Sequence, residues 1–426
     1  MNSRNNKLMK ILLILLFSFI AGMWVWNGYI HSEYYTADSS ARAQTAVSLP
    51  GTASAKDVEV NVAVNDRTGI LNERQKELLA AYARNYADTL CTLEAQDISG
   101  LFTKQDKSRY INMAAQKILV EIRKMSHLDL TLSYASVSYN ISEVKVSGST
   151  VTVYLTEENV QRFQHLTEDS CSYNINHKFV LEETDGSWLI KSHEQEEDFF
   201  LLAVEGWENA SGADYTARAE KTVELITADA LENKEVLKIS TGNPPEDIEV
   251  KNTAYDRDAA VEYARQWCNQ RNYTGNYLAY DDYGGNCQNF ASQCIYAGGI
   301  DMDYSGYGES QWKFYSRTLN TKQTATGRSY SWTGVDPFYT YATINRSNGL
   351  ICQADLRLEY AEKGDVIQVG AYNDWRHSLV VTDTVYDRNG NMIDITVASN
   401  TADRWNYPLS AYIYTYPRLI HILGQN

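Results

Sequence analysis

The chain has 426 residues, of which 44% are apolar and 22% charged, a composition typical of globular domains and not of disordered chains. Acidic residues outnumber basic ones by 54 to 38, so the formal net charge is -16. Nucleic-acid-binding proteins usually carry a basic surplus, so this balance argues against that class. At about 150 residues per domain, the length predicts two or three domains.

The N-terminal segment, residues 1–29, has the pattern of a secretory signal or an uncleaved signal anchor. Basic residues at positions 4, 7 and 10 precede an apolar run over residues 11–26, an order that is typical of export. The run is close to the lower limit of roughly 17 residues for spanning a bilayer. The small-x-small site at residues 41–43 lies well beyond it. We expect a membrane-anchored, extracytoplasmic protein of the cell envelope, with a cleaved and secreted form as the alternative.

Two stretches between the expected domains have the composition of linkers. Residues 30–65 are rich in Ser, Ala and Thr, and we expect them to form a tether. Residues 209–253 begin as a charged helical stretch and end in Gly242-Asn243-Pro244-Pro245, a strong boundary signal. These linkers delimit a middle domain, residues 66–208, and a C-terminal domain, residues 254–426.

The middle domain has helical patterns first and strand patterns afterwards. Residues 72–90 and 108–126 show helical spacing of apolar residues, and four alternating stretches follow up to residue 192. The last two stretches are joined by Asp185-Gly186, a strong hairpin signal. This order, with a last strand that begins Gly186-Ser187-Trp188, resembles the cone-shaped NTF2-like α+β domains. The resemblance implies an α+β fold for this part of the chain.

The C-terminal domain contains a cysteine at the start of an expected helix. Residues 284–299 begin and end with paired glycines, and Asn286 and Gly298 suit the two helix ends. Cys287 then lies in the first turn, where the helix dipole and unpaired backbone N–H groups should lower the pKa of its thiol and favour a thiolate nucleophile. The alternative is that Cys287 is a small buried apolar residue. Cys294 lies about 10 Å further along, too far for an unstrained disulfide, and is expected in the core.

A cysteine nucleophile needs a base, and the C-terminal domain offers His377 and His421. His421 lies in an expected last strand, whereas His377 begins a β-rich run and can point its ring into a cleft. From the pattern alone, His377 is either a catalytic base or an exposed turn residue. Asn400 follows the next expected strand and can orient the imidazole, with Asp403 as the reserve candidate. Cys, His and Asn in this order match a papain-type triad.

These residues resemble a known family, the amidase domain found in exported proteins of Gram-positive bacteria, which is related to the NlpC/P60 and CHAP cell-wall hydrolases. The resemblance implies a papain-like α+β fold and amide hydrolysis. The family often has Asp where this chain has Asn286, and His where it has Asn400. The matching motifs occur in the family's order and span nearly all of the C-terminal domain: Tyr255-x-Arg257-x-x-Ala260-x-x-Tyr263-Ala264, Gly284-Gly285-Asn286-Cys287-x-Asn289-Phe290-x-Ser292-Gln293, Gly364-Asp365-Val366-Ile367 and His377-Ser378-x-Val380-Val381-Thr382.

Together these features predict an exported, cysteine-dependent amide hydrolase that cuts a muramoyl-peptide or stem-peptide bond of peptidoglycan through a thioester. The expected catalytic residues are Cys287, His377 and Asn400, and Tyr280, Tyr283 and Asn286 are candidates for oxyanion or substrate contacts. The expected partners are a peptidoglycan or peptide amide and, through the N-terminal helix, the membrane.

No cofactor is expected, and no metal site, because HExxH is absent and the six cysteines lack ligand spacing. Two other functions remain open: a non-catalytic wall-binding or envelope scaffold protein, and a transglutaminase-like acyl transferase.

Overall fold

The computed structural model describes residues 58–104, 106–210, 214–233, 242–252, 254–273, 277–314, 328–346, 348–371, 374–413 and 416–426. The described residues form two compact units, one within residues 41–234 and one within residues 235–426. Both units combine helices with antiparallel sheet, so the chain is mixed α+β. The expected N-terminal anchor, residues 1–29, lies outside the described residues. Among the residues that are described, no helix is both long and apolar enough to cross a bilayer.

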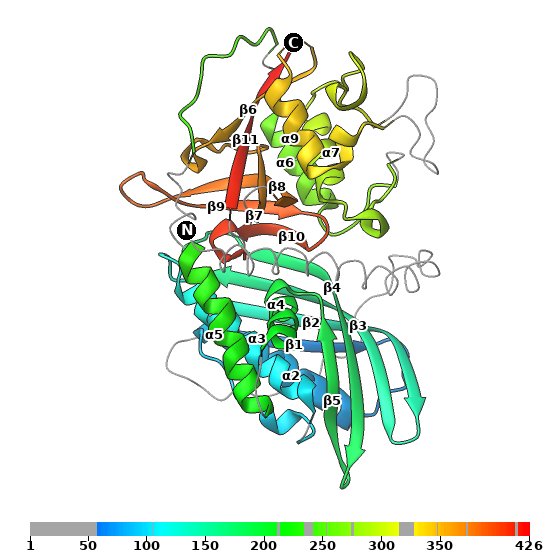
Figure 1. The fold of residues 1–426 in the computed structure, drawn as a ribbon. Coiled ribbons are helices and arrows are strands. Elements are labelled where there is room, and N and C mark those ends of the chain that lie inside the picture. The colour runs from blue at the N-terminus through cyan, green and yellow to red at the C-terminus, as the bar shows by residue number, and fades with distance from the viewer. Residues whose placement is uncertain are drawn as a thin grey trace. The chain divides into compact units, whose positions relative to one another are not determined.

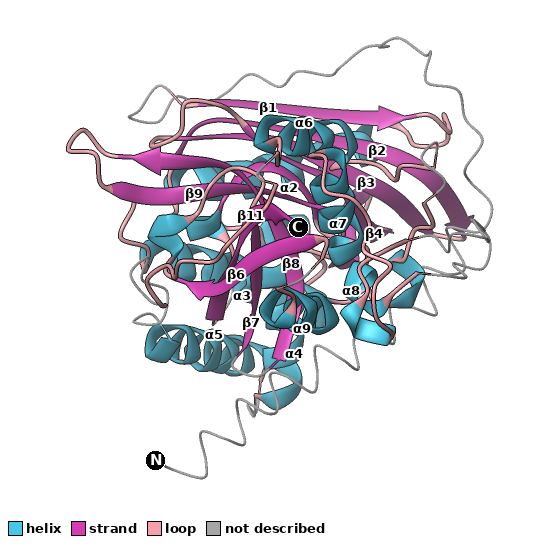
Figure 2. Cartoon of the chain, turned by 90° about the horizontal axis from the view of Figure 1, so that it is seen from above, coloured by secondary structure: helices cyan, strands magenta, loops and turns pink. Residues whose placement is uncertain are grey.

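The N-terminal unit joins helices to an extended sheet. In chain order its elements are β1 (Glu59–Asp66), α2 (Glu73–Thr92), η1 (Ser99–Leu101), α3 (Lys107–Lys124), β2 (Leu132–Ser147), β3 (Thr150–Phe163), β4 (Ser170–Thr184), β5 (Ser187–Gln195), α4 (Asp198–Asn209) and α5 (Tyr215–Asn233). The strand order is β1-β2-β3-β4-β5, with β1 parallel to β2 and the other neighbours antiparallel. Figure 2 shows β2, β3 and β4 as long neighbouring strands.

Local signals explain several of these elements. α2 begins at a capping box, in which Asn72 accepts from the backbone of Gln75 and Gln75 accepts from the backbone of Asn72. The predicted hairpin is confirmed, because Asp185 and Gly186 have φ of 51° and 76° and join the paired ends of β4 and β5. Positive φ at both central residues is the geometry of a two-residue hairpin turn whose twist matches that of the strands.

Two boundaries of this unit differ from the sequence expectation. Residues 59–65, expected to end the tether, form β1, which pairs with residues 134–141 of β2. α4 follows the predicted strands, and α5 is the helical stretch expected at the start of residues 209–253, which here belongs to the N-terminal unit and not to a linker. Both α4 and α5 pack against α3. The pairing of β1 with β2 and the packing of α4 and α5 on α3 join residues far apart in the chain, so no local sequence pattern predicts them.

The C-terminal unit has helices early in the chain and a sheet late. Its helices are α6 (Arg257–Trp267), η3 (Asp281–Tyr283), α7 (Cys287–Ala297), η4 (Gly308–Ser310), α8 (Tyr330–Thr333), α9 (Val335–Ile344), η5 (Leu358–Tyr360) and η6 (Leu409–Ala411). Its strands are β6 (Leu350–Leu356), β7 (Val366–Ala371), β8 (Asp374–Tyr386), β9 (Met392–Ser399), β10 (Asp403–Pro408) and β11 (Tyr416–Gln425). The order is β10-β9-β8-β7-β11-β6, with all these neighbours antiparallel.

Strand β8 separates two environments in this unit. Leu379 and Val381 belong to an apolar cluster with residues of β7, β9 and β11. Ser378 instead donates its hydroxyl to Gln288 of α7, and α6, α7 and α9 all contact β8. Figure 1 shows these three helices grouped together beside the sheet. Because side chains alternate along a strand, His377 extends from the same face of β8 as Leu379.

Candidate active site

Helix α7 places Cys287 at its first position, as the glycine pattern predicts. The helix runs over Cys287–Ala297, with Asn286 before it and Gly298 as its C-cap. The side chain of Asn286, however, caps no helical N–H group. Its Oδ1 instead accepts from the backbone N–H of Tyr280 at 3.1 Å and from Nδ2 of Asn289 at 2.8 Å. Asn286 therefore fixes the loop before the helix to the helix itself.

The turn between β9 and β10 holds Asn286 from the other side. Asn286 Nδ2 donates to Asn400 Oδ1 at 3.0 Å, and the Asn286 backbone N–H donates to Thr401 Oγ1 at 2.8 Å. Thr401 and Ala402 have φ of 62° and 55°, a left-handed conformation that costs an L-residue roughly 1–2 kcal/mol. A strained backbone conformation persists only where surrounding contacts hold it in place. Here the hydrogen bonds from Asn286 to Asn400 and Thr401 are among those contacts.

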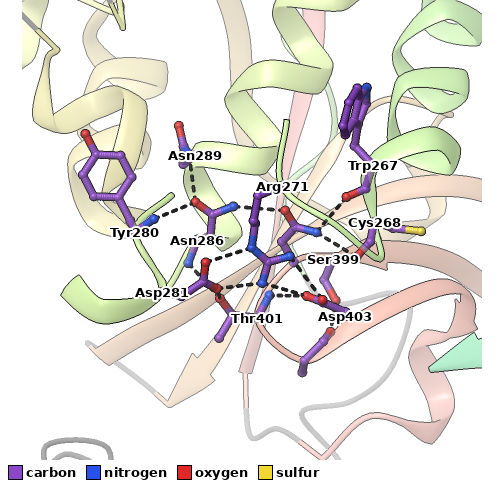
Figure 3. Close-up of polar contacts among 12 residues, drawn as sticks. Trp267, Cys268, Arg271, Tyr280, Asp281, Asn286, Asn289, Ser399, Thr401 and Asp403 are labelled. Carbon is purple, nitrogen blue, oxygen red and sulfur yellow. Dashed lines mark hydrogen bonds and ion pairs between the residues drawn. The ribbon is translucent and has the colours of Figure 1, made fainter. Parts of the chain in front are cut away.

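A mostly buried arginine, 13% exposed, fixes the same turn. Arg271 donates to both carboxylate oxygens of Asp281 at 2.7 and 2.8 Å, and to Asp403 at 3.1 Å. Asp403 also accepts from the backbone N–H of Thr401 at 2.9 Å. Figure 3 shows Arg271 between the two carboxylates, next to Asn286. Burial alone would raise the pKa of Asp281, but Arg271 outweighs it, so this pKa lies below its ordinary value.

The sulfur of Cys287 lies against the backbone on both sides of His377. Its Sγ is 3.9 Å from the carbonyl oxygen of Arg376, and it accepts a hydrogen bond from the backbone N–H of Ser378. Cys287 is 4% exposed. Burial raises the pKa of its thiol, and the N–H groups of Ser378, Gln288 and Cys287 itself lower it only in part. The expected lowering of this pKa is therefore wrong, because the first turn of α7 is buried and not solvated.

The imidazole of His377 lies beside Tyr412, with the two ring centroids 6.5 Å apart. Burial and the nearby Arg404 guanidinium lower the pKa of His377 to about 3. Its Nε2 is buried and has no hydrogen-bond partner among the described residues, and no hydrogen bond in the described part of the chain joins the thiol to the imidazole. The structure thus brings Cys287 to the backbone of His377, with the thiol and the imidazole both neutral.

Within the described residues, neither predicted orienting residue is hydrogen-bonded to His377. Asn400 donates to the carbonyl oxygens of Trp267 at 3.0 Å and Cys268 at 2.7 Å, and it accepts from Asn286. Asp403 is engaged by Arg271 and Thr401. Both side chains therefore position the turn and the start of α7, and the expected role of Asn400 as the imidazole's partner is not what the structure shows.

The sequence reasoning missed a polar network that joins α7 to β8. Gln288 Oε1 accepts from Ser378 Oγ at 2.6 Å and from Gln368 Nε2 at 3.2 Å. Arg418 Nε in turn donates to Gln368 Oε1 at 2.8 Å. Because Gln288 and Ser378 directly follow Cys287 and His377, this network fixes the distance between the two. In the sequence, the only sign of this network is that polar residues occur inside otherwise apolar strands. The pattern alone does not show which of these residues bond to one another.

The two tyrosines proposed for oxyanion or substrate contacts differ in exposure. Tyr280 is 6% exposed, and its buried hydroxyl lies beside the Arg328 guanidinium, whose charge and hydrogen bond oppose the rise that burial gives to the pKa of Tyr280. Tyr283 is 73% exposed, and its ring lies edge-on to that of Tyr280 at 6.2 Å between centroids. Of the two, Tyr280 therefore has the buried hydroxyl and Tyr283 the exposed ring.

Two of the motif segments form a structural clamp away from Cys287. Tyr255 donates to the carbonyl oxygen of Gly364 at 2.8 Å, and Arg257 donates to Asp365 at 2.7 Å. His421 is the other histidine considered as a base. Its Nδ1 lies 2.7 Å from Oδ2 of the fully buried Asp365. This clamp ties α6 to β11 and to the turn before β7, so these motif residues stabilise the fold.

All six cysteines are described, and all are free thiols. Cys268 and Cys294 are 2% and 0% exposed, which confirms that Cys294 belongs to the core and places Cys268 there as well. Among the described residues, no group of His, Cys, Asp and Glu is arranged to hold a metal ion.

Comparison with known proteins places the C-terminal unit near an amidase family. Residues 254–423 match the model of a family described as "Putative amidase domain". This confirms, at the level of an amidase domain, the resemblance found in the motifs, and it suggests an amide hydrolase. The "Uncharacterized protein YhbB" of Bacillus subtilis (strain 168) is 28% identical over 241 residues, which make up 55% of this chain and 68% of that protein.

Two solved structures align weakly with the chain. A "Putative Scytalone Dehydratase" from Novosphingobium aromaticivorans has 12% identity and a TM-score of 0.19, over 29% of this chain and 83% of its own. A protein of unknown function from Mycobacterium tuberculosis, Rv3472, has 14% identity and a TM-score of 0.21, over 37% of this chain and 95% of its own. At these TM-scores neither alignment carries an argument about fold or function.

Proposed function

We propose that the C-terminal unit is a cysteine-dependent amide hydrolase with Cys287 as nucleophile and His377 as base. The observation that carries the proposal is the position of the Cys287 sulfur, at the first residue of α7 and against the peptide groups that flank His377. The imidazole extends from the same face of β8 as Leu379 and lies beside Tyr412, so the proposal includes a change of the His377 side-chain rotamer that brings it to the sulfur. Catalytic hydrogen bonds often tighten only when substrate binds.

The pKa shifts indicate how the reaction begins. The pKa of the thiol is raised and that of the imidazole is lowered, so the resting pair is neutral. We propose that His377 removes the thiol proton as Cys287 attacks the amide carbonyl, as general-base catalysis requires. The imidazolium formed next to Arg404 is destabilised by that cation, which favours rapid transfer of the proton to the leaving amine. Water, deprotonated by the neutral imidazole, then cleaves the thioester and releases the acid.

The substrate that we propose is a peptide amide of peptidoglycan, either the muramoyl-peptide bond or a stem-peptide bond. Support comes from the export pattern of residues 1–29 and from the motif resemblance to NlpC/P60 and CHAP hydrolases. In this proposal the N-terminal segment anchors the chain in the membrane or directs its secretion. The proposal includes a papain-like fold for the C-terminal unit and an NTF2-like fold for the N-terminal unit.

The test is digestion of purified cell wall by the full chain, with release of new amino groups as the readout. The wild type and Cys294→Ala, a matched variant that removes a buried thiol of the same helix, should both digest the wall. Cys287→Ala should release no more than background. Equal release by Cys287→Ala and the wild type would exclude Cys287 as nucleophile. Incorporation of an amine probe in place of hydrolysis would identify a transglutaminase-like transferase, and wall binding without either reaction would identify a scaffold.

A further inference from the structure

The structure holds an arginine beside the candidate active site with no carboxylate to pair with in the described part of the chain. The guanidinium carbon of Arg328 lies 5.1 Å from the ring centroids of both Tyr280 and Tyr330. Arg328 Nε is buried and has no hydrogen-bond partner among the described residues. The buried Tyr280 hydroxyl lies beside the guanidinium, whose charge and hydrogen bond oppose the rise that burial gives to the pKa of Tyr280. A buried donor without a partner costs about 1–3 kcal/mol, so the Arg328 Nε–H points to an acceptor that a ligand would bring.

Both groups are fixed to the beginning of α7. The backbone N–H of Tyr280 donates to Asn286, and its carbonyl oxygen accepts from Gly285 at 3.1 Å. The segment that follows Arg328 is held by Trp332, whose indole N–H donates to Asn289 at 3.0 Å and whose carbonyl oxygen accepts from Ser292 at 2.9 Å. With Asn286 directly before Cys287 and bonded to the backbone N–H of Tyr280, the backbone of Tyr280 lies roughly 10 Å or less from that of Cys287.

The chemistry of the two groups defines what they bind. A guanidinium N–H is a donor only and carries a fixed positive charge, and it prefers carboxylate or phosphate oxygens. The Tyr280 hydroxyl adds a second donor, and Figure 3 shows its ring directed away from the Asn286 network. The flanking rings of Tyr280 and Tyr330 hold the guanidinium in place through cation–π contacts. Peptide carboxylates are the anions present in a wall peptide, so a carboxylate is the group that fits.

We propose that Arg328 and Tyr280 form a subsite for a carboxylate of the peptide substrate, next to the amide attacked by Cys287. This inference rests on the proposed function and adds to it a substrate class, namely peptides that carry a free carboxylate close to the scissile bond. It assigns Arg328 and Tyr280 to substrate specificity and not to the chemical step. The carboxylate supplies the acceptor that Arg328 Nε lacks, and the neighbouring Tyr280 hydroxyl can donate to it as well.

The test compares two probes that differ only in charge: N-acetylmuramoyl-L-alanyl-D-glutamate and its uncharged diamide. Affinities are measured by calorimetry on the full-length Cys287→Ala variant, so that no turnover occurs. The carboxylate probe should bind about 10-fold or more tightly than the diamide, as expected for a charge-assisted hydrogen bond at a partly exposed site. Adding Arg328→Gln should bring that ratio close to 1, whereas Arg328→Lys should retain part of it. The matched control, Arg388→Gln at the exposed turn between β8 and β9, should leave it unchanged.

A substitution of Tyr280 separates a role in specificity from a role in catalysis. In the active chain, Tyr280→Phe should lower the ratio of kcat/KM values for the two probes. If Tyr280 were instead an oxyanion donor, Tyr280→Phe would lower kcat equally for both probes, and its part of the proposal would be wrong. Equal affinity of the two probes for the parent variant, or binding of neither, would overturn the subsite. A charge preference without any Cys287-dependent hydrolysis would overturn the proposed function and leave the subsite standing.

Discussion

Removal of the Arg271 side chain tests whether the buried ion-pair network holds the candidate site together. The side chain is 13% exposed, and its partners Asp403 and Asp281 are 5% and 31% exposed. In Arg271→Met both carboxylates lose their cation. Breaking a fully buried pair costs about 3–5 kcal/mol, and the partial exposure of Asp281 reduces its share. We therefore expect a loss of about 3 kcal/mol in the free energy of unfolding at pH 7.

The pH dependence of that loss follows from the direction of the pKa shifts. In the wild type, the pKa of Asp281 is below its ordinary value, so its stabilisation is present above the unfolded-state pKa, about 3.9, and is lost as the pH falls through the folded-state pKa. In Arg271→Met, burial acts on Asp281 without the opposing cation, so the pKa of its carboxyl is raised. A carboxylate with a raised pKa takes up a proton as the pH falls, so the difference from the wild type should be smaller at pH 4.5 than at pH 7.

The assay is urea unfolding of the full chain, followed by tryptophan fluorescence, at pH 7 and pH 4.5. Arg388→Met, at an exposed turn, is the matched control and should change the free energy of unfolding by less than about 0.5 kcal/mol. The double variant Arg271→Met/Asp403→Asn should recover part of the loss, because one buried charge is gone. A loss below about 0.5 kcal/mol at pH 7, or a loss that is equal at the two pH values, would refute the reasoning.

Three further predictions follow from the same geometry. Because its thiol pKa is raised, Cys287 should react slowly with iodoacetamide at pH 6 and faster above pH 9 when followed by mass spectrometry, and rapid alkylation at pH 6 would contradict a neutral resting thiol. Ala402→Gly should raise the free energy of unfolding by about 0.5 kcal/mol, because glycine adopts positive φ without strain, although it loses more chain entropy on folding. Gly364→Ala should cost about 2–3 kcal/mol, since its Cβ would lie 2.6 Å from the Tyr255 hydroxyl oxygen. Gly390→Ala, which has the same φ of +81° but open space around it, should cost only about 1 kcal/mol, and equal losses would exclude the clash.

Features that depend on neighbouring residues could be predicted from the sequence. The bounds of α7 were predicted correctly by the flanking glycines, although Asn286 does not cap the helix as expected, and the β4–β5 hairpin was marked by Asp185-Gly186. Each of these signals works through backbone conformations that a few adjacent residues determine.

Features that depend on contacts distant in the chain could not be predicted. Asn400 was expected to orient His377, but it hydrogen-bonds to residues 114 to 133 positions earlier. The pKa of Cys287 was expected to be lowered by the helix dipole, but the packing of β8 over the sulfur buries it and reverses the sign. Burial is a property of the assembled fold, so a helix position alone does not fix a pKa.

The most direct test of the Cys287–His377 pair is detection of the acyl-enzyme. The full chain is mixed with soluble wall peptides and quenched in acid within its first turnovers, and the peptide containing Cys287 is analysed by mass spectrometry. The account predicts that this peptide gains the mass of the acyl fragment in the wild type, and that His377→Ala forms the adduct far more slowly. Hydrolysis of the wall peptides with the acyl fragment on another residue, or unaltered adduct formation in His377→Ala, would contradict it.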